Sequence, residues 1–482
     1  IYSQIITSAV TVGFGGSVGL EAPIVTSGSA IGSTVGRFLG LSYKEVTMLL
    51  ACGAASGIAG AFNSPIAGIV FAIEVLLPEF SIPAFIPLLL SAATAAVVAR
   101  LFYNQQLFFL VTEGWAVNAV IFYVLLAVLI GLFSIYFTKA NYFVKNFFYK
   151  IEHPYKRVVI GGLMLGLMVF LFPTLYGEGY ITIKNLLKGD DLNIINNSIF
   201  SDFNKFPSLV ILFTVVTIFA KSVATLVTLG AGGNGGTFAP SLIMGGLIGF
   251  IFAYTVNLTG LVHLNTANFI VAGMAAALSA IMHAPLTGIF LIAEITGGYI
   301  LMVPLMITSA ISYLINRGFQ KHSIYTKALA DKGELLSYED KDTTVLSQMK
   351  LRYLIEKDYL QLHDHELLSH RINDILASKR NICAVLDEHN IFKGVLYVEE
   401  VFNELMKNPD KDQLTANFLL HTDIVVVLIA DDLKLVLQKM EREKVWVIPV
   451  VGADNSFKGF VSKTSIFNKY RDLLKRQANY MD

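Results

Sequence analysis

The chain has 482 residues, no formal net charge at pH 7, and a hydrophobic fraction of 54% with a mean hydropathy of +0.61. Soluble proteins of this length are less apolar, so most of the chain is expected to face lipid. The balanced charge, with no basic run longer than a few residues, gives no sign of a nucleic-acid partner.

The charged residues are unevenly distributed. Residues 1–318 contain 24 of the 72 Asp, Glu, Lys and Arg residues, so a membrane region is expected to join a soluble region near residue 320. Cys52 and Cys383, one in each region, are predicted to be buried small apolar residues, without a disulfide framework or a Cys-based metal site. No signal peptide is recognisable, and the chain is expected to begin inside a longer protein.

The membrane region is predicted to consist of interrupted helices. Apolar segments are expected at about 1–14, 22–40, 46–62, 65–77, 83–103, 117–138, 157–176, 207–230, 237–258, 267–283, 285–296 and 300–315. Several are shorter than the ~20 residues that cross the hydrocarbon. Breaks at 62–65 and 282–285 and in two Gly clusters are typical of a transporter, because non-helical backbone at membrane depth must be buried or line a wet cavity.

Two of these breaks carry related sequences. Gly15–Pro23 and Gly232–Pro240 share three Gly, one Ala and one Pro at an offset of 217 residues, but Phe238 stands where the first copy has Glu21. Residues 53–74 and 273–294 match at an offset of 220 residues. The membrane region is therefore predicted to contain two homologous halves, about 1–115 and 116–330, with a site near the midplane between them.

The Gly motifs suggest an anion site. Helix N-termini carry unpaired N–H groups and about half a positive charge, so two of them at membrane depth bind an anion without a formal cation. Pro23 and Pro240 suit the first turns of the following helices. Glycines that serve only close helix packing are the alternative, but packing does not explain Glu21. Glu21 is predicted to be a gate that competes with the anion for the N–H groups.

Among the charged residues in the apolar segments, three have informative positions. Glu74 and Glu294 occupy equivalent places in the two halves, which favours a structural role. Lys221 precedes the second Gly motif and is expected either to bias the pathway toward anions or to pair with a carboxylate.

The soluble region alternates β-branched runs with charged helical stretches. Two strand-turn-strand patterns, at 381–396 and 447–461, are each flanked by amphipathic helices, at about 366–378 and 398–407 in the first copy and 431–443 and 463–474 in the second. A linker at 331–340 and two small α/β modules at 341–410 and 411–482 are predicted.

Residues 1 to about 330 resemble the CLC family of chloride channels and proton-coupled chloride antiporters. Gly19–Pro23 is similar to the family's Gly-Arg/Lys-Glu-Gly-Pro motif, Gly236–Pro240 to its Gly-x-Phe-x-Pro motif, and Phe62–Glu74 to its following block. The resemblance implies an α-helical, multi-pass membrane protein with broken helices in an inverted internal repeat. It also implies a homodimer with one pore per subunit.

The resemblance assigns roles to individual residues. Glu21 is the gating glutamate, while N–H groups around Thr237 and Phe238 and the Tyr325 hydroxyl hold the central anion. The positions implied to bind the anion are Gly19, Leu20, Glu21, Ala22, Gly236, Thr237, Phe238, Ala239 and Tyr325. No enzymatic residue, metal or required cofactor is implied, and chloride is the transported ligand. Tyr325 disfavours fluoride, because fluoride-specialised relatives usually alter that position.

Three departures from the family pattern bear on the mechanism. The Gly-Ser-Gly-Ile-Pro motif that precedes these segments is absent from the sequence, and Leu20 and Ala22 replace the Arg/Lys and Gly of the first motif. Proton-coupled members generally carry a second glutamate directly after the Glu74 position. Here that residue is Val75, which cannot exchange a proton, and Glu74 is the nearest carboxylate that could substitute.

The resulting prediction is a voltage-gated type of chloride channel in the cell membrane, with passive conduction gated by Glu21. Proton-coupled chloride antiport is the alternative. A regulated cation transporter is disfavoured, because residues 207–318 contain only Glu294 as an acid and a divalent cation needs several oxygen ligands. A non-conducting regulatory subunit is favoured only by the missing N-terminal motif.

The paired modules resemble CBS domains, which implies a cytoplasmic pair that modulates gating. CBS modules often bind adenine nucleotides through a Ser or Thr followed three residues later by an Asp. The second module keeps Ser462 but lacks the Asp, so nucleotide binding is the weaker expectation. A dimerising or gate-coupling platform is the alternative.

Overall fold

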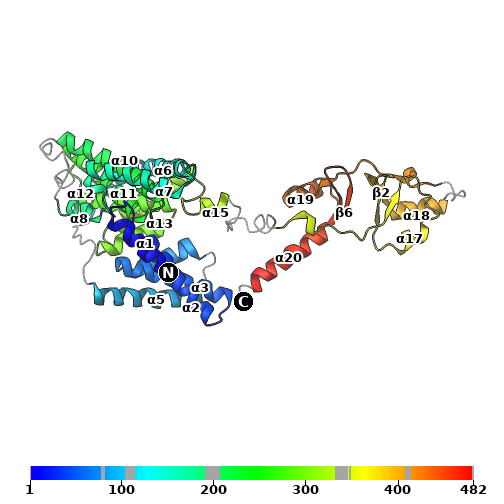
Figure 1. The fold of residues 1–482 in the computed structure, drawn as a ribbon, viewed down its shortest axis with the longest axis horizontal. Helices are drawn as coiled ribbons and strands as arrows, with labels where there is room; N and C mark the ends of the chain where they lie inside the picture. Colours follow the sequence, from blue (N-terminus) through cyan, green and yellow to red (C-terminus); the bar gives the residue numbers. More distant parts are fainter. Residues whose placement is uncertain are drawn as a thin grey trace. The chain divides into compact units, whose positions relative to one another are not determined.

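The computed structural model describes residues 2–77, 82–103, 114–189, 207–331, 346, 349–407 and 414–479. These residues belong to two compact units, Ile1–Leu335 and Leu336–Asp482. Helices make up the first unit, whereas the second combines helices with short strands (Figure 1).

The first unit is built from long and short apolar helices. They are α1 (Tyr2–Gly13), α2 (Glu21–Phe38), α3 (Tyr43–Phe62), α4 (Pro65–Phe71), α5 (Ile82–Phe102), α6 (Val120–Tyr149), α7 (Pro154–Leu171), α8 (Tyr180–Leu187), α10 (Pro207–Gly230), α11 (Phe238–Leu258), α12 (Thr266–Met282), α13 (Pro285–Ile295), α14 (Met302–Phe319) and α15 (Lys327–Asp331). A π-helical turn, η1 (Ala72–Leu76), continues α4.

Length and composition identify candidate membrane spans. Among the described residues, six helical stretches are long and apolar enough to cross a membrane, and three shorter apolar helices, Pro65–Leu76, Thr266–Met282 and Pro285–Ile295, accompany them. The prediction of a polytopic membrane region with broken helices is therefore confirmed. The apolar run predicted at 117–138 continues as a helix to Tyr149, because the more polar residues after 138 still form helical turns.

The breaks at 62–65 and 282–285 have the same local structure. α3 and α12 are both followed by a residue in the left-handed conformation, Asn63 (φ 53°) and His283 (φ 58°). Each next helix then begins with a proline, Pro65 or Pro285, whose ring suits the first turn. The two halves thus interrupt their apolar runs with the same turn chemistry.

The halves also repeat one helix crossing. α2 packs on α3 where Gly28 meets Gly53, and a Cβ on Gly28 would lie 2.2 Å from the Gly53 carbonyl oxygen. α11 packs on α12 where Gly245 meets Gly273, and a Cβ on Gly245 would again lie 2.2 Å from the opposing carbonyl oxygen. Part of the repeated glycine pattern therefore serves close helix packing, as small residues do between membrane helices.

The second unit contains two modules of the same topology. In the first, β1 (Gln361–His363) runs parallel to β2 (Ile382–Leu386), which pairs antiparallel with β3 (Phe392–Tyr397). In the second, β4 (Val427–Leu428) runs parallel to β5 (Val447–Val451), which pairs antiparallel with β6 (Phe457–Ser462). The helices are α17 (Ile372–Ala377), α18 (Val398–Lys407), α19 (Leu433–Arg442) and α20 (Lys463–Asn479).

The hairpins and flanking helices lie close to their predicted positions, but the parallel strands β1 and β4 were not predicted. These strands have three and two residues, too short for an alternating pattern to be recognised. Each sheet has its own apolar core, and Cys383 on β2 is buried in the first. Met349, Leu351 and Leu354 pack in the core of the second sheet, and Leu414 and Ala416 pack in the core of the first, so the cores cross the predicted module boundary at 410/411. Burial raises the pKa of the Cys383 thiol to about 11, in agreement with a structural cysteine.

Candidate functional site

The two Gly-rich motifs meet in the first unit. The Gly19 N–H donates to the Gly236 carbonyl oxygen at 2.9 Å, and the Gly236 N–H donates to the Gly19 carbonyl oxygen at 2.8 Å, in an antiparallel bridge. α2 begins two residues after Gly19 and α11 begins two residues after Gly236. The N-termini of both helices therefore converge on one place, where their partial positive charges add.

The hydrogen bonds of this junction show which of the nine residues predicted to bind an anion have backbone N–H groups that are already paired. The N–H groups of Gly19 and Gly236 each donate to the other residue's carbonyl oxygen. The Leu20 N–H donates to Glu178 Oε1 at 3.3 Å. The first intrahelical bonds begin with the N–H groups of Ile24 and Ser241. The N–H groups of Glu21, Ala22, Phe238 and Ala239 precede those bonds, so they have no acceptor within their own helices.

Neither bridging glycine has room for a side chain. A Cβ on Gly19 would lie 2.0 Å from Glu21 Oε2, and a Cβ on Gly236 would lie 2.7 Å from the Ala22 Cβ. The close approach of the two helix starts therefore requires glycine at both positions. It also shows that the Glu21 carboxylate lies directly beside the bridge.

The Glu21 side chain is 4% exposed. Its Oε1 accepts a hydrogen bond of 2.5 Å from the Tyr180 hydroxyl, and its Oε2 has no hydrogen-bond partner within the described part of the chain. Oε2 lies on the side of Gly19 and Ala239, at the start of α11. A carboxylate in this place takes the position where the two sets of N–H groups would meet an anion.

Phe238 has a different surrounding from its repeat counterpart, Glu21. The Phe238 side chain is 2% exposed and its ring lies 5.5 Å, centroid to centroid, from that of Phe62. Apolar packing in one half and a hydrogen-bonded carboxylate in the other explain how the two copies of one motif diverged in chemistry.

Tyr325 also reaches the junction. Its hydroxyl lies 2.8 Å from Thr237 Oγ1, although 88 residues separate the two in sequence. Both residues line a pocket of about 220 Å³ whose polar lining includes Asn141 and Lys145 from α6. The lysine gives this pocket a positive charge, which is favourable for an anion.

Glu74 and Glu294 cap helices in opposite halves. Glu74 accepts hydrogen bonds from the N–H groups of Leu286 (3.0 Å) and Thr287 (2.8 Å) and from the Thr287 hydroxyl (2.7 Å), at the start of α13. Glu294 accepts from the N–H groups of Ile66 (3.2 Å) and Ala67 (2.8 Å), at the start of α4. This reciprocal exchange agrees with a two-fold relation between the halves and with a structural role for both carboxylates.

Val75 lies in the π-helical turn η1, next to Glu74, and is 38% exposed. An apolar side chain at this position neither accepts nor releases a proton. Because Glu74 is engaged at the start of α13, it is not free to take over a neighbouring role without uncapping that helix.

Sequence reasoning missed residues 176–180, which lead into α8 and include its first residue. The Tyr176 hydroxyl donates to the Gly13 carbonyl oxygen at 2.6 Å, Glu178 contacts Leu20, and Tyr180 contacts Glu21. Lys221 on α10 is 1% exposed, and its Nζ donates to the carbonyl oxygen of Gly177 at 2.8 Å. A Gly-x-Gly pattern around a carboxylate was the available signal, but no periodicity linked it to the first motif.

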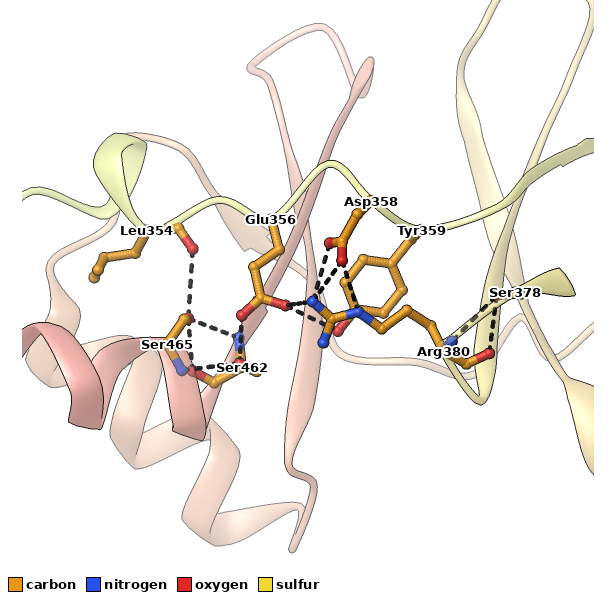
Figure 2. Close-up of polar contacts among 8 residues, drawn as sticks. All are labelled: Leu354, Glu356, Asp358, Tyr359, Ser378, Arg380, Ser462 and Ser465. Atoms are coloured by element: carbon orange, nitrogen blue, oxygen red, sulfur yellow. Dashed lines mark hydrogen bonds and ion pairs between the residues drawn. The ribbon is translucent and has the colours of Figure 1, made fainter.

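The predicted nucleotide contact in the second unit is engaged within the protein (Figure 2). The Ser462 hydroxyl donates to Glu356 Oε1 at 2.6 Å, and the guanidinium of Arg380 lies 2.8 Å from Glu356 Oε2 and 2.8 Å from Asp358 Oδ2. Burial and the negative charge of Glu356 raise the pKa of the neighbouring Tyr359 hydroxyl to about 12. A nucleotide would have to displace a carboxylate from Ser462.

Comparison with protein families gives a match in the first unit. The protein family described as "Voltage gated chloride channel" matches residues 1–317. The H(+)/Cl(-) exchange transporter ClcA of Vibrio parahaemolyticus is 32% identical over 328 residues, which are 66% of this chain and 66% of that protein. A putative chloride channel protein, ClcB-like, of Ralstonia nicotianae is 30% identical over 67% of this chain and 73% of that protein.

Solved structures show the same fold. A slow cyanobacterial Cl-/H+ antiporter superimposes with a TM-score of 0.54 at 22% identity, covering 68% of this chain and 75% of the other. A CLC-type fluoride/proton antiporter superimposes with a TM-score of 0.55 at 24% identity, covering 67% of this chain and 75% of the other. The chain spans just under two thirds of the length of the Vibrio relative.

Proposed function

Because the chain belongs to the voltage-gated chloride channel family, whose model matches residues 1–317, we propose that it moves chloride across a membrane in exchange for protons. The observation that carries this proposal is the buried Glu21 carboxylate at the meeting point of the α2 and α11 N-termini. One carboxylate that competes with an anion and also binds a proton is the minimum that exchange requires.

The proposed cycle uses the two states of Glu21. Ionised, the carboxylate stays beside Gly19, held by the Tyr180 hydroxyl and by the partial charges of both helix starts. Protonated, it loses most of that attraction, and an anion takes its place on the N–H groups of Phe238 and Ala239. Proton binding and anion binding thus favour each other at one site.

Exchange replaces passive conduction as the preferred function, although Val75 had indicated a channel. The curated relative at 32% identity is named an exchange transporter, which supports the alternative reading. Val75 then implies that protons reach Glu21 without a side chain at that position, through water or another group. Passive conduction is the second candidate, and Val75 is the observation that favours it.

Flux from liposomes separates the two candidates. Purified protein in vesicles with a chloride gradient and no proton gradient is expected to drive proton movement against the proton's own equilibrium, at a fixed ratio to chloride. Chloride flux without any proton movement would instead establish the passive channel. Absence of chloride flux in protein-containing vesicles would contradict both.

Tyr325 is proposed to contact the transported anion together with Thr237. Tyr325→Phe should weaken chloride binding by about 1 kcal/mol, roughly fivefold, because one hydroxyl donor is lost from a partly exposed site. Calorimetric titration of detergent-solubilised protein with chloride measures this change. Tyr313→Phe is the matched control, since the Tyr313 hydroxyl contacts Arg317 and lies outside the site. Equal chloride affinity in both variants would remove Tyr325 from the anion site.

The second unit is proposed to be a cytoplasmic pair of CBS domains, 341–410 and 411–482, following a linker at 331–340. Residues 332–340 of that linker lie outside the described part of the chain. The repeated module topology supports this assignment. Because the Glu356 carboxylate accepts from Ser462 and contacts Arg380, a nucleotide that takes the Ser462 hydroxyl is expected to loosen the Glu356–Arg380 contact. A homodimer is likewise proposed from family membership.

A further inference from the structure

Residues 176–180, which end at the first residue of α8, hold the end of α1 and the first Gly motif at three points. Tyr176 bonds to Gly13 (2.6 Å), Glu178 to the Leu20 N–H (3.3 Å), and Tyr180 to the Glu21 carboxylate (2.5 Å). The outer two contacts come from tyrosine hydroxyls, which donate. The middle contact comes from a carboxylate, so a second negative charge lies one residue from the gate.

Glu178 has a buried cation nearby. The Lys221 ammonium donates to the carbonyl oxygens of Gly177 (2.8 Å) and Leu175 (3.4 Å), so it lies within the backbone turn that carries Glu178. A Cβ on Gly179 would lie 3.4 Å from Lys221 Nζ. The ammonium is therefore close to both residues that flank Glu178, Gly177 and Gly179. Burial raises the pKa of the Glu178 carboxyl, and the Leu20 N–H and the positive charge of Lys221 act against that rise.

The charged and titratable groups that act on Glu178 come from three elements. Lys221 on α10 attracts its negative charge, Glu21 on α2 repels it, and Tyr180 on α8 lies close to both carboxylates and contacts Glu21. The repulsion between Glu21 and Glu178 is strongest when both are ionised. Protonation or movement of Glu21 is therefore expected to change the strength of the hydrogen bond between the Leu20 N–H and the Glu178 carboxylate.

We propose that Glu178 is a second carboxylate that competes with the anion, holding the Leu20 N–H when the path is closed and releasing it toward the Lys221 ammonium when an anion arrives. The proposal rests on the proposed anion-transport function. It follows from the pairing of an amide at the start of α2 with a carboxylate that has an alternative, cationic partner within its own turn. An incoming anion gains the Leu20 amide, and Lys221 compensates the displaced negative charge.

The competing explanation is that Glu178 only stabilises the fold by accepting the Leu20 N–H. The variant Glu178→Gln distinguishes this structural role from competition with the anion. The amide side chain of this variant keeps an oxygen that accepts from the Leu20 N–H but has no negative charge. A purely structural role would leave chloride binding unchanged. The competition mechanism predicts roughly tenfold tighter chloride binding and a weaker dependence of chloride affinity on pH, because one ionisable competitor is gone.

The test is calorimetric titration of the full-length detergent-solubilised protein with chloride between pH 5 and 8. Glu45→Gln is the matched control, because Glu45 also accepts a backbone N–H bond at a helix start but is exposed beside Ser42. Glu178→Asp is the second variant, in which a shorter side chain keeps the charge but draws away from Leu20, and it should also bind chloride more tightly. Chloride affinity equal to that of the unaltered protein in Glu178→Gln, or in Glu178→Asp if the Gln variant does not fold, would overturn the proposal.

The outcomes also separate this proposal from the proposed function. If the unaltered protein binds chloride but moves no protons, exchange fails while the Glu178 comparison still stands or falls on chloride affinity. If the unaltered protein neither binds nor moves chloride, both proposals are overturned.

Discussion

Glu21→Gln is expected to abolish proton movement while leaving chloride movement intact. The Gln side chain keeps the oxygen that accepts from Tyr180 but neither ionises nor carries a proton, so it resembles the protonated gate. Chloride-driven proton uptake in liposomes should fall to the level of protein-free vesicles. Chloride flux in the unaltered protein should decrease as pH rises, since the ionised carboxylate competes with the anion, whereas flux in the variant should fall less steeply between pH 5 and 8, because only Glu178 remains as an ionisable competitor.

Two comparisons make the Glu21 result specific. Glu45→Gln removes an exposed carboxylate at the start of α3 and should leave both fluxes unchanged. Glu21→Ala removes the side chain and should behave like Glu21→Gln, with higher chloride flux because nothing occupies the space beside Gly19. Proton coupling that survives in both Glu21 variants, with a pH response as steep as that of the unaltered protein, would remove Glu21 from the mechanism.

Removing Glu74 or Glu294 is expected to destabilise the first unit. Glu74→Ala leaves three donors at the start of α13 without their acceptor, and Glu294→Ala leaves two at the start of α4. Hydrogen bonds to charged acceptors contribute roughly 1.5–3 kcal/mol each, so at the lower end of that range we expect a loss of about 4.5 kcal/mol for the three bonds of Glu74→Ala and about 3 kcal/mol for the two bonds of Glu294→Ala. The measurement is the thermal unfolding midpoint in detergent.

A further variant at this position, Glu74→Gln, tests whether Glu74 carries protons. Val75→Ala is the control, because it alters the neighbouring side chain in the same turn without touching the cap. The double variant Glu74→Ala, Glu294→Ala should lose less stability than the sum of the single variants, since α4 and α13 contact each other. If Glu74→Gln kept full thermal stability and chloride flux but lost proton movement, Glu74 would be a proton carrier rather than a cap.

Much of the membrane region could be predicted because the breaks between its helices depend on the residues at the breaks themselves. Asn63 and Pro65, or His283 and Pro285, end one helix and start another whatever surrounds them. The repeat offset similarly indicated that the two Gly motifs belong together. The choice between channel and exchanger was less secure, because it rested on the single residue Val75.

The contacts of the site residues could not be predicted in the same way. Nothing in the spacing of residues 13–21 and 176–180 indicates that they touch, since more than 150 residues separate them and no shared period connects them. The same holds for Ser462 and Glu356, which are 106 residues apart. Such pairs depend on which surfaces the packed helices and strands bring together.

Composition, the two Gly motifs and the proline-started helices were sufficient for the sequence alone to determine a membrane fold of two related halves with an acidic residue at a helix start. These features depend on backbone preferences and on the length of apolar runs, which act over a few residues. Only the tertiary structure decided which amides pair across the two Gly motifs, which hydroxyl holds Glu21, and which carboxylates cap helices. Those partners are chosen by burial, because a buried polar group must bond to whatever donor or acceptor the packed neighbours present.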